Sequence, residues 1–253
     1  MAKRPRSNNL SLVLVLLVVG GIAADATRRI LQRPAVEAPP RPPADTSTSV
    51  AGASAPGPRD SAAAARVARV RARIAEDAER TYIMPTLQET DSTVRRWPDR
   101  RFAHPLRVAV LRRDVTGYRE DFAANVTWAI GHWNGVLPIG FATGADSGEA
   151  DVVITWASRL DSGKTGRTDL TWDRGGNIHH AFVTLATHDA NGHALDSPRM
   201  GSLALHELGH TLGLGHSPVP SDALYPIATA LELTDRDRRT ARLLYELPAG
   251  SIR

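Results

Sequence analysis

The segment from residue 206 to residue 216, HELGHTLGLGH, constrains the fold and chemistry of this chain most. Residues four positions apart lie on one face of an α-helix, so the imidazoles of His206 and His210 can approach one ion. Gly213 stands where this helix should end, because glycine readily adopts positive φ and lets the chain turn sharply. That turn can bring His216 to the same ion. The spacing therefore predicts a helix that ends at a three-histidine metal site.

Three protein ligands leave one tetrahedral position of Zn²⁺ open for water, as a catalytic zinc requires. Glu207 follows the first histidine, and we expect it to take a proton from the zinc-bound water and to pass it to a leaving amine. The chain has no cysteine, which excludes a Cys-ligated zinc site, a disulfide framework and a Cys nucleophile. The alternative is a core helix that carries histidines without a metal. It accounts poorly for three His and a Glu at these spacings.

The hydrophobic pattern predicts an α+β domain from about residue 101 onwards, with alternating strand and helix signals. Apolar and β-branched runs predict strands over Leu106–Leu111, Leu137–Ala142, Asp151–Trp156, Thr168–Trp172 and Ile178–Thr187. Apolar residues at helical spacing predict helices over Tyr118–Val136, over the segment after Pro198 that carries His206, and over Thr234–Tyr245.

The motif HELGHTLGLGHS at 206–217 resembles the long zinc motif of the metzincins, and among them of the matrixin-like metallopeptidases. DVVITW at 151–156, then a Gly-containing hairpin and the zinc helix, follow the order of elements in that family, and LTDRDRRTARLLY at 233–245 resembles its C-terminal helix. The resemblance covers about residues 100–248. It implies a zincin domain with a five-stranded mixed, twisted sheet and three helices. It also implies an antiparallel edge strand along the cleft, where a peptide substrate binds in extended form.

This chain departs from the family in the Met-containing turn beneath the metal. Ala223-Leu224-Tyr225-Pro226 stands at that place, with Leu224 in the methionine's position or with one residue missing. Exchange of Leu for Met roughly conserves volume and usually costs under about 1.5 kcal/mol, so we expect the floor of the site to be intact. Tyr225 is expected to be a structural turn residue. Contact of Tyr225 with the metal site or the reaction intermediate is the alternative.

Matrixins often hold a second, structural zinc, and His180-Ala181-Phe182 is similar to part of that site. No His-x-Asp pair precedes it, so we expect the histidines of this region to be surface residues of strands and loops: His179, His180, His188 and His193. Latency through a pro-segment cysteine is impossible in a chain without cysteine. If residues 62–95 inhibit the enzyme, they must use another ligand, such as a carboxylate.

The N-terminus predicts export. Three basic residues within positions 3–6 precede the apolar run Leu10–Ala24, and Ala24-Asp25-Ala26 offers a small-x-small cleavage site, as in a secretory signal. The run is short for a membrane span of about 20 residues, but an uncleaved anchor through residues 10–24 is the alternative. We therefore expect a secreted, extracellular or periplasmic protein, with a possible membrane tether.

Four parts of the chain follow from this pattern. They are a signal peptide or signal anchor (1–26), a Pro/Ala-rich disordered linker (27–60), a helical extension or pro-segment (61–97) and the metzincin-like zinc peptidase domain (98–253). The extension should form a helix over Ala62–Tyr82 that Pro85 ends.

The predicted function is that of a zinc-dependent endopeptidase acting on a peptide or protein substrate. The net charge of +4 comes without a basic patch interleaved with aromatics in the C-terminal half, so no nucleic-acid partner is expected. One alternative is a catalytically weak or inactive metzincin-like zinc-binding interaction module, motivated by the altered Met-turn, and another is a non-peptidase zinc amidase. Glu207 favours the enzyme over the module, because binding alone needs no base.

Overall fold

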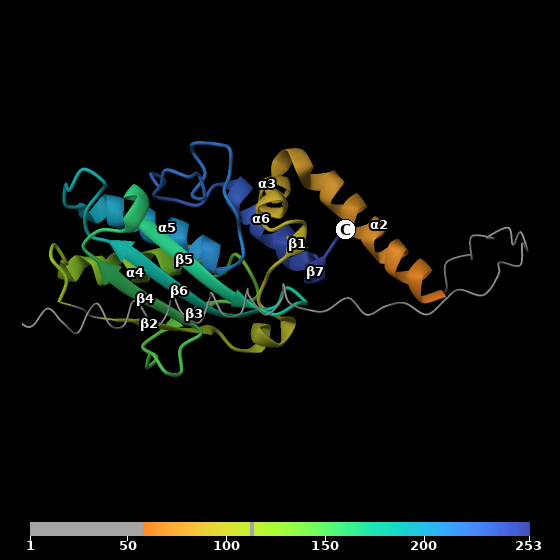
Figure 1. The fold of residues 1–253 in the computed structure, drawn as a ribbon, viewed down its shortest axis with the longest axis horizontal. Helices are drawn as coiled ribbons and strands as arrows, with labels where there is room; N and C mark the ends of the chain where they lie inside the picture. The colour runs from red at the N-terminus through yellow and green to blue at the C-terminus, as the bar shows by residue number, and fades with distance from the viewer. Residues whose placement is uncertain (1–57, 112–113) are drawn as a thin grey trace, which may run out of the picture. The chain divides into compact units, whose positions relative to one another are not determined.

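The computed structural model describes residues 58–253 except 112–113, and a central sheet organises this part of the chain (Figure 1). The five strands follow the order β3-β2-β4-β6-β5. They are β2 (Leu106–Val110), β3 (Phe141–Thr143), β4 (Val152–Ala157), β5 (Gly166–Trp172) and β6 (Ile178–Ala186). All neighbours pair in parallel except β5, which is antiparallel to β6 and forms the edge of the sheet. The expected five-stranded mixed sheet with an antiparallel edge strand is confirmed.

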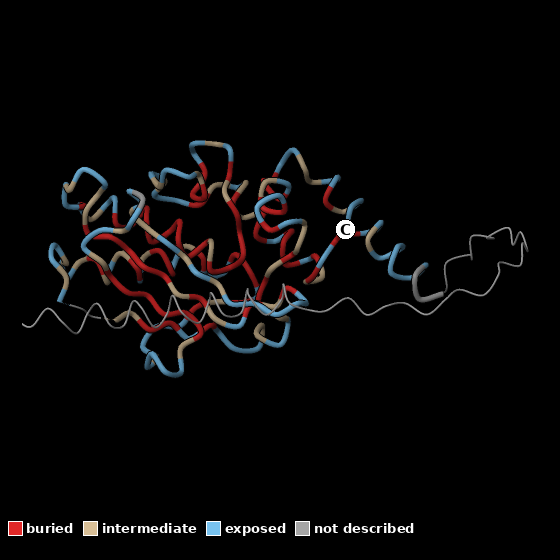
Figure 2. Tube along the Cα trace, viewed as in Figure 1, coloured by how far each residue is buried: buried red, intermediate tan, exposed pale blue. Residues whose placement is uncertain are grey.

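The burial of each strand matches its place in the sheet (Figure 2). β4 is buried at five consecutive positions, as a central parallel strand covered on both faces requires. β5 instead alternates between half-buried and exposed residues along most of its length. Polar residues of β5 therefore lie at an accessible edge.

The prediction of a strand over Leu137–Ala142 is largely wrong, because only Phe141–Thr143 forms β3. The side-chain amide of Asn134 bonds both the N–H (2.8 Å) and the C=O (3.2 Å) of Phe141 and closes a loop before the strand. Leu137 and Ile139 are buried from this loop. Their apolar character serves packing of the loop against the core and not strand pairing.

Three helices accompany the sheet: α4 (Glu120–Trp133), α5 (Ser197–Thr211) and α6 (Asp235–Glu246). Helix α5 packs on α4 and against β5 and β6, and the Trp133 indole donates to the Leu205 carbonyl (2.9 Å). The Asp196 side chain caps α5, and Pro198 lies in its first turn, where the missing N–H costs nothing. Thr234 and Asp237 form a capping box at the start of α6.

The chain before the sheet forms α2 (Pro58–Asp77), a 3₁₀ turn η1 (Ala78–Arg80) and α3 (Ile83–Glu89). The prediction that Pro85 ends the first helix is wrong, because that helix ends earlier and Pro85 lies in the first turn of α3. The short strands β1 (Thr93–Val94) and β7 (Gly250–Ser251) pair antiparallel. Two further 3₁₀ turns are η2 (Asp99–Ala103) and η3 (Asp161–Gly163).

The predicted signal segment, with its tether at residues 10–24, and most of the predicted linker lie outside the described residues. Across 58–111 and 114–253, no helix has both the length and the apolar character needed to cross a membrane.

Candidate metal centre

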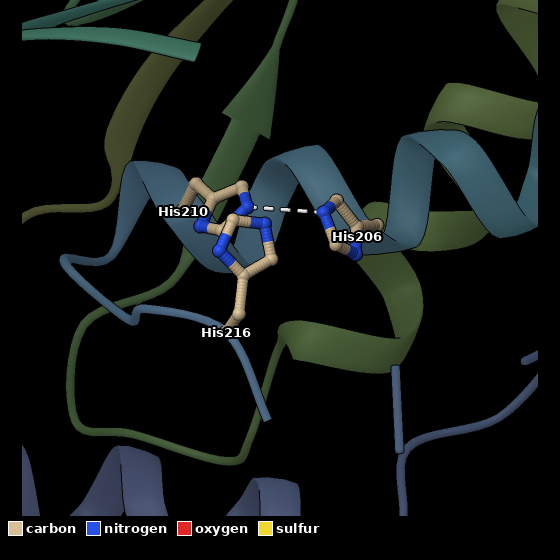
Figure 3. Close-up of side chains that lie close together, drawn as sticks. All are labelled: His206, His210 and His216. Carbon is tan, nitrogen blue, oxygen red and sulfur yellow. Dashed lines mark hydrogen bonds between the residues drawn. The ribbon is translucent and has the colours of Figure 1, made fainter. Parts of the chain in front are cut away.

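Helix α5 and the loop after it bring three predicted histidines together (Figure 3). His206 and His210 lie one turn apart on α5, and their Nε2 atoms are 3.0 Å apart. Gly213, with φ of +94°, turns the chain beyond the helix and returns His216 to the same place. One ring nitrogen of each histidine lies within 4.8 Å of the others. Within the described residues, no other group of three or more His, Cys, Asp or Glu is placed to hold a metal.

Each of the three rings has its Nδ1 bound to an oxygen that can only accept. His206 Nδ1 donates to the Ala223 carbonyl (2.9 Å), and His210 Nδ1 donates to the Leu214 carbonyl (2.8 Å). His216 Nδ1 donates to the Glu89 carboxylate (3.1 Å). In the neutral ring, a protonated Nδ1 leaves Nε2 as the free lone pair. All three histidines are therefore held in the tautomer that ligates a metal through Nε2.

The electrostatics and spacing of this donor set fit zinc. Burial lowers the pKa of His206 to about 4 and that of His210 to about 3, so both rings are neutral near pH 7. Two nitrogens that share a tetrahedral zinc lie about 3.3 Å apart, close to the observed Nε2 separation of His206 and His210. Imidazole nitrogens are suitable ligands for zinc, and the spacing of these two matches a tetrahedral zinc site.

Glu207 lies next to this group and is buried, with 4% of its surface exposed. Burial raises the pKa of the Glu207 carboxyl to about 7, while a hydrogen bond from Thr168 acts in the opposite direction. The Thr168 hydroxyl donates to Glu207 Oε2 over 2.6 Å. Strand β5 approaches Glu207 so closely at Gly166 that an added Cβ would overlap the carboxylate. The edge strand thus forms one wall of the pocket that holds this side chain.

The turn at 223–226 lies beneath the first histidine. Ala223 accepts from His206 through its carbonyl and donates its N–H to Asp237 (3.0 Å). Leu224 is fully buried and packs on α5 beside Gly209. Tyr225 is half-buried, and its N–H donates to the Asp222 carbonyl (3.1 Å).

A cleft runs across the candidate centre between β5 and the chain after the turn. It is lined by His206, Glu207 and His210 of α5 and by His216 of the loop that follows this helix. It is also lined by Gly166, Thr168 and Leu170 of β5 and by Pro226, Ile227 and Ala228 of the chain after the turn. The edge strand and the candidate centre therefore face the same solvent-accessible groove.

The remaining predicted histidines lie away from the triad, on β6 and the loop that follows it. His180 is half-buried on β6, and His179 is exposed and lies 3.4 Å from Asp173. His188 bonds the Thr187 hydroxyl (2.9 Å), and His193 lies 3.3 Å from Asp189.

Sequence reasoning missed three neighbours of the site: Glu89, Gly166 and Thr168. Glu89 lies 127 positions before the histidine that it contacts, and no local spacing connects the two. The signal that could have found Gly166 and Thr168 is the antiparallel edge strand along the cleft, which the family resemblance implied and which β5 forms.

Comparison with known protein families shows to which family this chain belongs. The family model described as Matrixin, Peptidase_M10, matches residues 99–246, more than half of the chain. The chain belongs to the matrixin family. Matrixins are zinc metallopeptidases, and this matrixin has a three-histidine group that can hold the metal.

Curated relatives match over part of their length. This matrixin is 36% identical to matrilysin of Rattus norvegicus over 109 residues, covering 39% of each chain. It is 33% identical to macrophage metalloelastase of Oryctolagus cuniculus over 124 residues, covering 46% of this chain and 26% of that protein. It is 29% identical to metalloendoproteinase 2-MMP of Arabidopsis thaliana over 147 residues, covering 54% of this chain and 36% of that protein. The chain thus spans between a quarter and two fifths of the length of these relatives.

Proposed function

We propose that this matrixin is a zinc-dependent endopeptidase, with His206, His210 and His216 as zinc ligands and Glu207 as the general base. The observation that carries the proposal is the convergence of three Nδ1-bound imidazoles beside a buried carboxylate in an open groove. A structural zinc site is closed by four protein ligands, whereas three ligands leave a position for water.

The chemistry that zinc supplies at such a site is Lewis acidity, which polarises a carbonyl and lowers the pKa of a water molecule. The chain's own residues handle the proton. The Glu207 carboxylate accepts a proton from the attacking water and delivers it to the amine that leaves. Thr168 holds one carboxylate oxygen, Oε2, and so fixes the direction in which Oε1 faces.

Strand β5 offers the means to hold an extended substrate. It is the edge of the sheet in the described part of the chain, and its residues line the same groove as Glu207. An extended peptide can add to a sheet edge through main-chain hydrogen bonds, which bind peptides of varied sequence. This supports a peptide or protein substrate, with its scissile bond placed over the histidines.

Metal analysis and cleavage of a broad peptide library test the proposal, with the unmodified chain compared with Glu207→Ala and His210→Ala. We expect about one zinc per chain and cleavage in the unmodified protein, zinc without cleavage in Glu207→Ala, and loss of both in His210→Ala. Equal cleavage by the unmodified chain and Glu207→Ala would remove Glu207 from the mechanism. Zinc without turnover in the unmodified chain would instead indicate a binding module.

We also propose that the chain is exported, on the strength of the tri-basic start and apolar run within residues 1–26. Mass spectrometry of the protein after expression in a secreting host distinguishes a chain whose signal peptide has been cleaved from a chain that keeps it as a membrane anchor. Cleavage after Ala26 gives a shortened chain, and a membrane-bound chain of full mass indicates an anchor.

A further inference from the structure

Helix α3 reaches the candidate metal centre from outside the matched matrixin region. Glu89 is its last residue, and the match begins only at residue 99. Oε1 of Glu89 accepts two hydrogen bonds from one residue, the backbone N–H of His216 (3.0 Å) and its Nδ1–H (3.1 Å). A single carboxylate oxygen thus fixes both the backbone and the ring of His216.

The three histidines differ in how they are supported. His206 and His210 lie on α5, and their Nδ1 atoms bind backbone carbonyls that no substitution removes. His216 lies in the loop beyond the helix, with 40% of its side chain exposed. Its Nδ1 partner is the side chain of Glu89. The least constrained candidate ligand therefore depends on a replaceable carboxylate.

The protein core fixes the position of α3. Ile83, Thr86 and Leu87 are buried, with exposed fractions of at most 3%. The Thr86 hydroxyl accepts the N–H of Gly215 (3.1 Å), next to the histidine that Glu89 holds. Helix α3 thus binds two consecutive residues of the ligand loop from a packed base.

Two roles are open to a carboxylate that the extension brings to this site. An inhibitory carboxylate would have to enter the ligand set, where the ring nitrogens of the three histidines meet. Glu89 instead lies on the Nδ1 side of His216, and it is not among the groups placed to share a metal with the histidines. The geometry favours support of the ligand over blockage of the centre.

We propose that Glu89 is a positioning residue that holds His216 for metal binding, so that helix α3 supports the metal centre instead of inhibiting it. The inference rests on the proposed function, because it presupposes that the histidines bind zinc. Carboxylate partners of metal-bound histidines fix the ring orientation and tautomer, raise the basicity of the ligating nitrogen, and typically account for about 10- to 100-fold in metal affinity.

Zinc affinity of the full-length chain tests this directly, measured by competition with a chromophoric chelator. We expect Glu89→Ala to bind zinc about 10- to 100-fold more weakly than the unmodified chain. Glu89→Gln keeps an oxygen acceptor but loses the charge, and charge-assisted hydrogen bonds are roughly twice as strong as neutral ones, so about a fivefold loss is expected. The control Glu149→Ala removes an exposed glutamate that pairs with Arg107 and should leave affinity unchanged.

The ¹⁵N spectrum of the histidine side chains separates positioning from a merely structural role. In zinc-loaded unmodified protein, His216 should show a protonated Nδ1 and a metal-bound Nε2. In Glu89→Ala the His216 signals should shift or broaden, while those of His206 and His210 stay in place. A purely structural role would lower the melting temperature of the metal-free protein without this selective change, and that result would overturn the inference.

The remaining outcomes are equally decisive. Unchanged zinc affinity in Glu89→Ala would overturn the inference but leave the proposed function standing. Higher peptidase activity at unchanged zinc affinity would do the same, because it would mark Glu89 as an inhibitory residue. If Glu89→Ala does not fold, unchanged affinity in Glu89→Gln overturns the inference. Failure of the unmodified chain to bind zinc would overturn the proposed function itself and the inference with it.

Discussion

The hydroxyl of Thr168 donates a 2.6 Å hydrogen bond to the carboxylate of Glu207, joining the edge strand of the sheet to the helix that carries two candidate zinc ligands. The strand that should hold the substrate and the residue that should move the proton are thus fixed to each other. The orientation of the candidate base therefore depends on the position of β5.

Thr168→Val keeps the shape of the side chain and removes the hydroxyl. A hydrogen bond to a charged group contributes about 1.5–3 kcal/mol, so we expect kcat/KM to fall about 10- to 100-fold while zinc content stays constant. Peptide hydrolysis and metal analysis measure the two. Thr168→Ser, which retains the hydroxyl, should keep most of the activity. If the Val and Ser variants are equally active, the hydrogen bond plays no part in turnover.

Gly166→Ala should displace the candidate base, because a Cβ there overlaps the Glu207 carboxylate and approaches Leu203. A shift of about 1 Å in a catalytic group can cost about 100-fold in rate, so activity should fall by at least that factor. Gly131→Ala is the matched control, since nothing lies within 4 Å of its added Cβ on the exposed face of α4. That control should keep full activity and gain about 0.5–1 kcal/mol in the free energy of unfolding.

Tyr82→Phe should lower the free energy of unfolding. The Tyr82 hydroxyl donates to Asp237 Oδ1 (3.0 Å) in the core, and its loss leaves a buried carboxylate oxygen without that donor. An unsatisfied buried group costs about 1–3 kcal/mol, which urea unfolding can measure. The control is Asp235→Ala, which removes an exposed acid from α6, the helix that carries Asp237. It should change the free energy of unfolding by less than about 1 kcal/mol. Equal losses in both variants would contradict the assigned contact.

Stability should decline in strongly alkaline solution. Burial raises the pKa of Tyr82 and Tyr245 above the value of about 10 that tyrosine has in an unfolded chain. Below about pH 10 both states keep these protons, and the contribution to stability is fully present. Above it the unfolded chain releases them first, so the free energy of unfolding falls as the pH rises, by up to about 1.4 kcal/mol per pH unit for each group.

Urea unfolding between pH 9 and pH 11.5 checks this dependence, and Tyr245→Phe should flatten it. Absorbance at 295 nm follows the ionisation of the four tyrosines in the folded protein. If all four ionise with a midpoint of about 10 before unfolding, the hydroxyls of Tyr82 and Tyr245 are not protected as the structure indicates.

Local rules predicted the part of the site that lies on one helix. The i,i+4 spacing of His206 and His210 and the turn at Gly213 follow from local geometry, and the apolar run at 151–156 predicted the strand that forms β4. The resemblance supplied the number of strands and the antiparallel edge strand along the cleft, but not the order of the strands in the sheet. None of this needed contacts between distant segments.

The missed features all depend on such contacts. Glu89 acquires its role through packing of α3 against the core, which no nearby sequence pattern reveals. The run 137–142 has strand-like composition, but the bonds from Asn134 to Phe141 hold most of it in a loop. Pro85 was predicted to end a helix, yet proline is equally suited to begin one, and only the fold decides between the two.

The pairing of β1 with β7 has a consequence for anyone trimming this protein. Both strands lie outside the matched residues 99–246, and each is the hydrogen-bonding partner of the other. Arg96, just after β1, exchanges backbone hydrogen bonds with Gly176 and Ile178 at the start of β6. An expression fragment cut at the family boundaries would therefore lose a backbone connection at both ends at once, together with the helix that supports His216. The residues that support the candidate metal centre therefore extend beyond the residues by which the family is recognised.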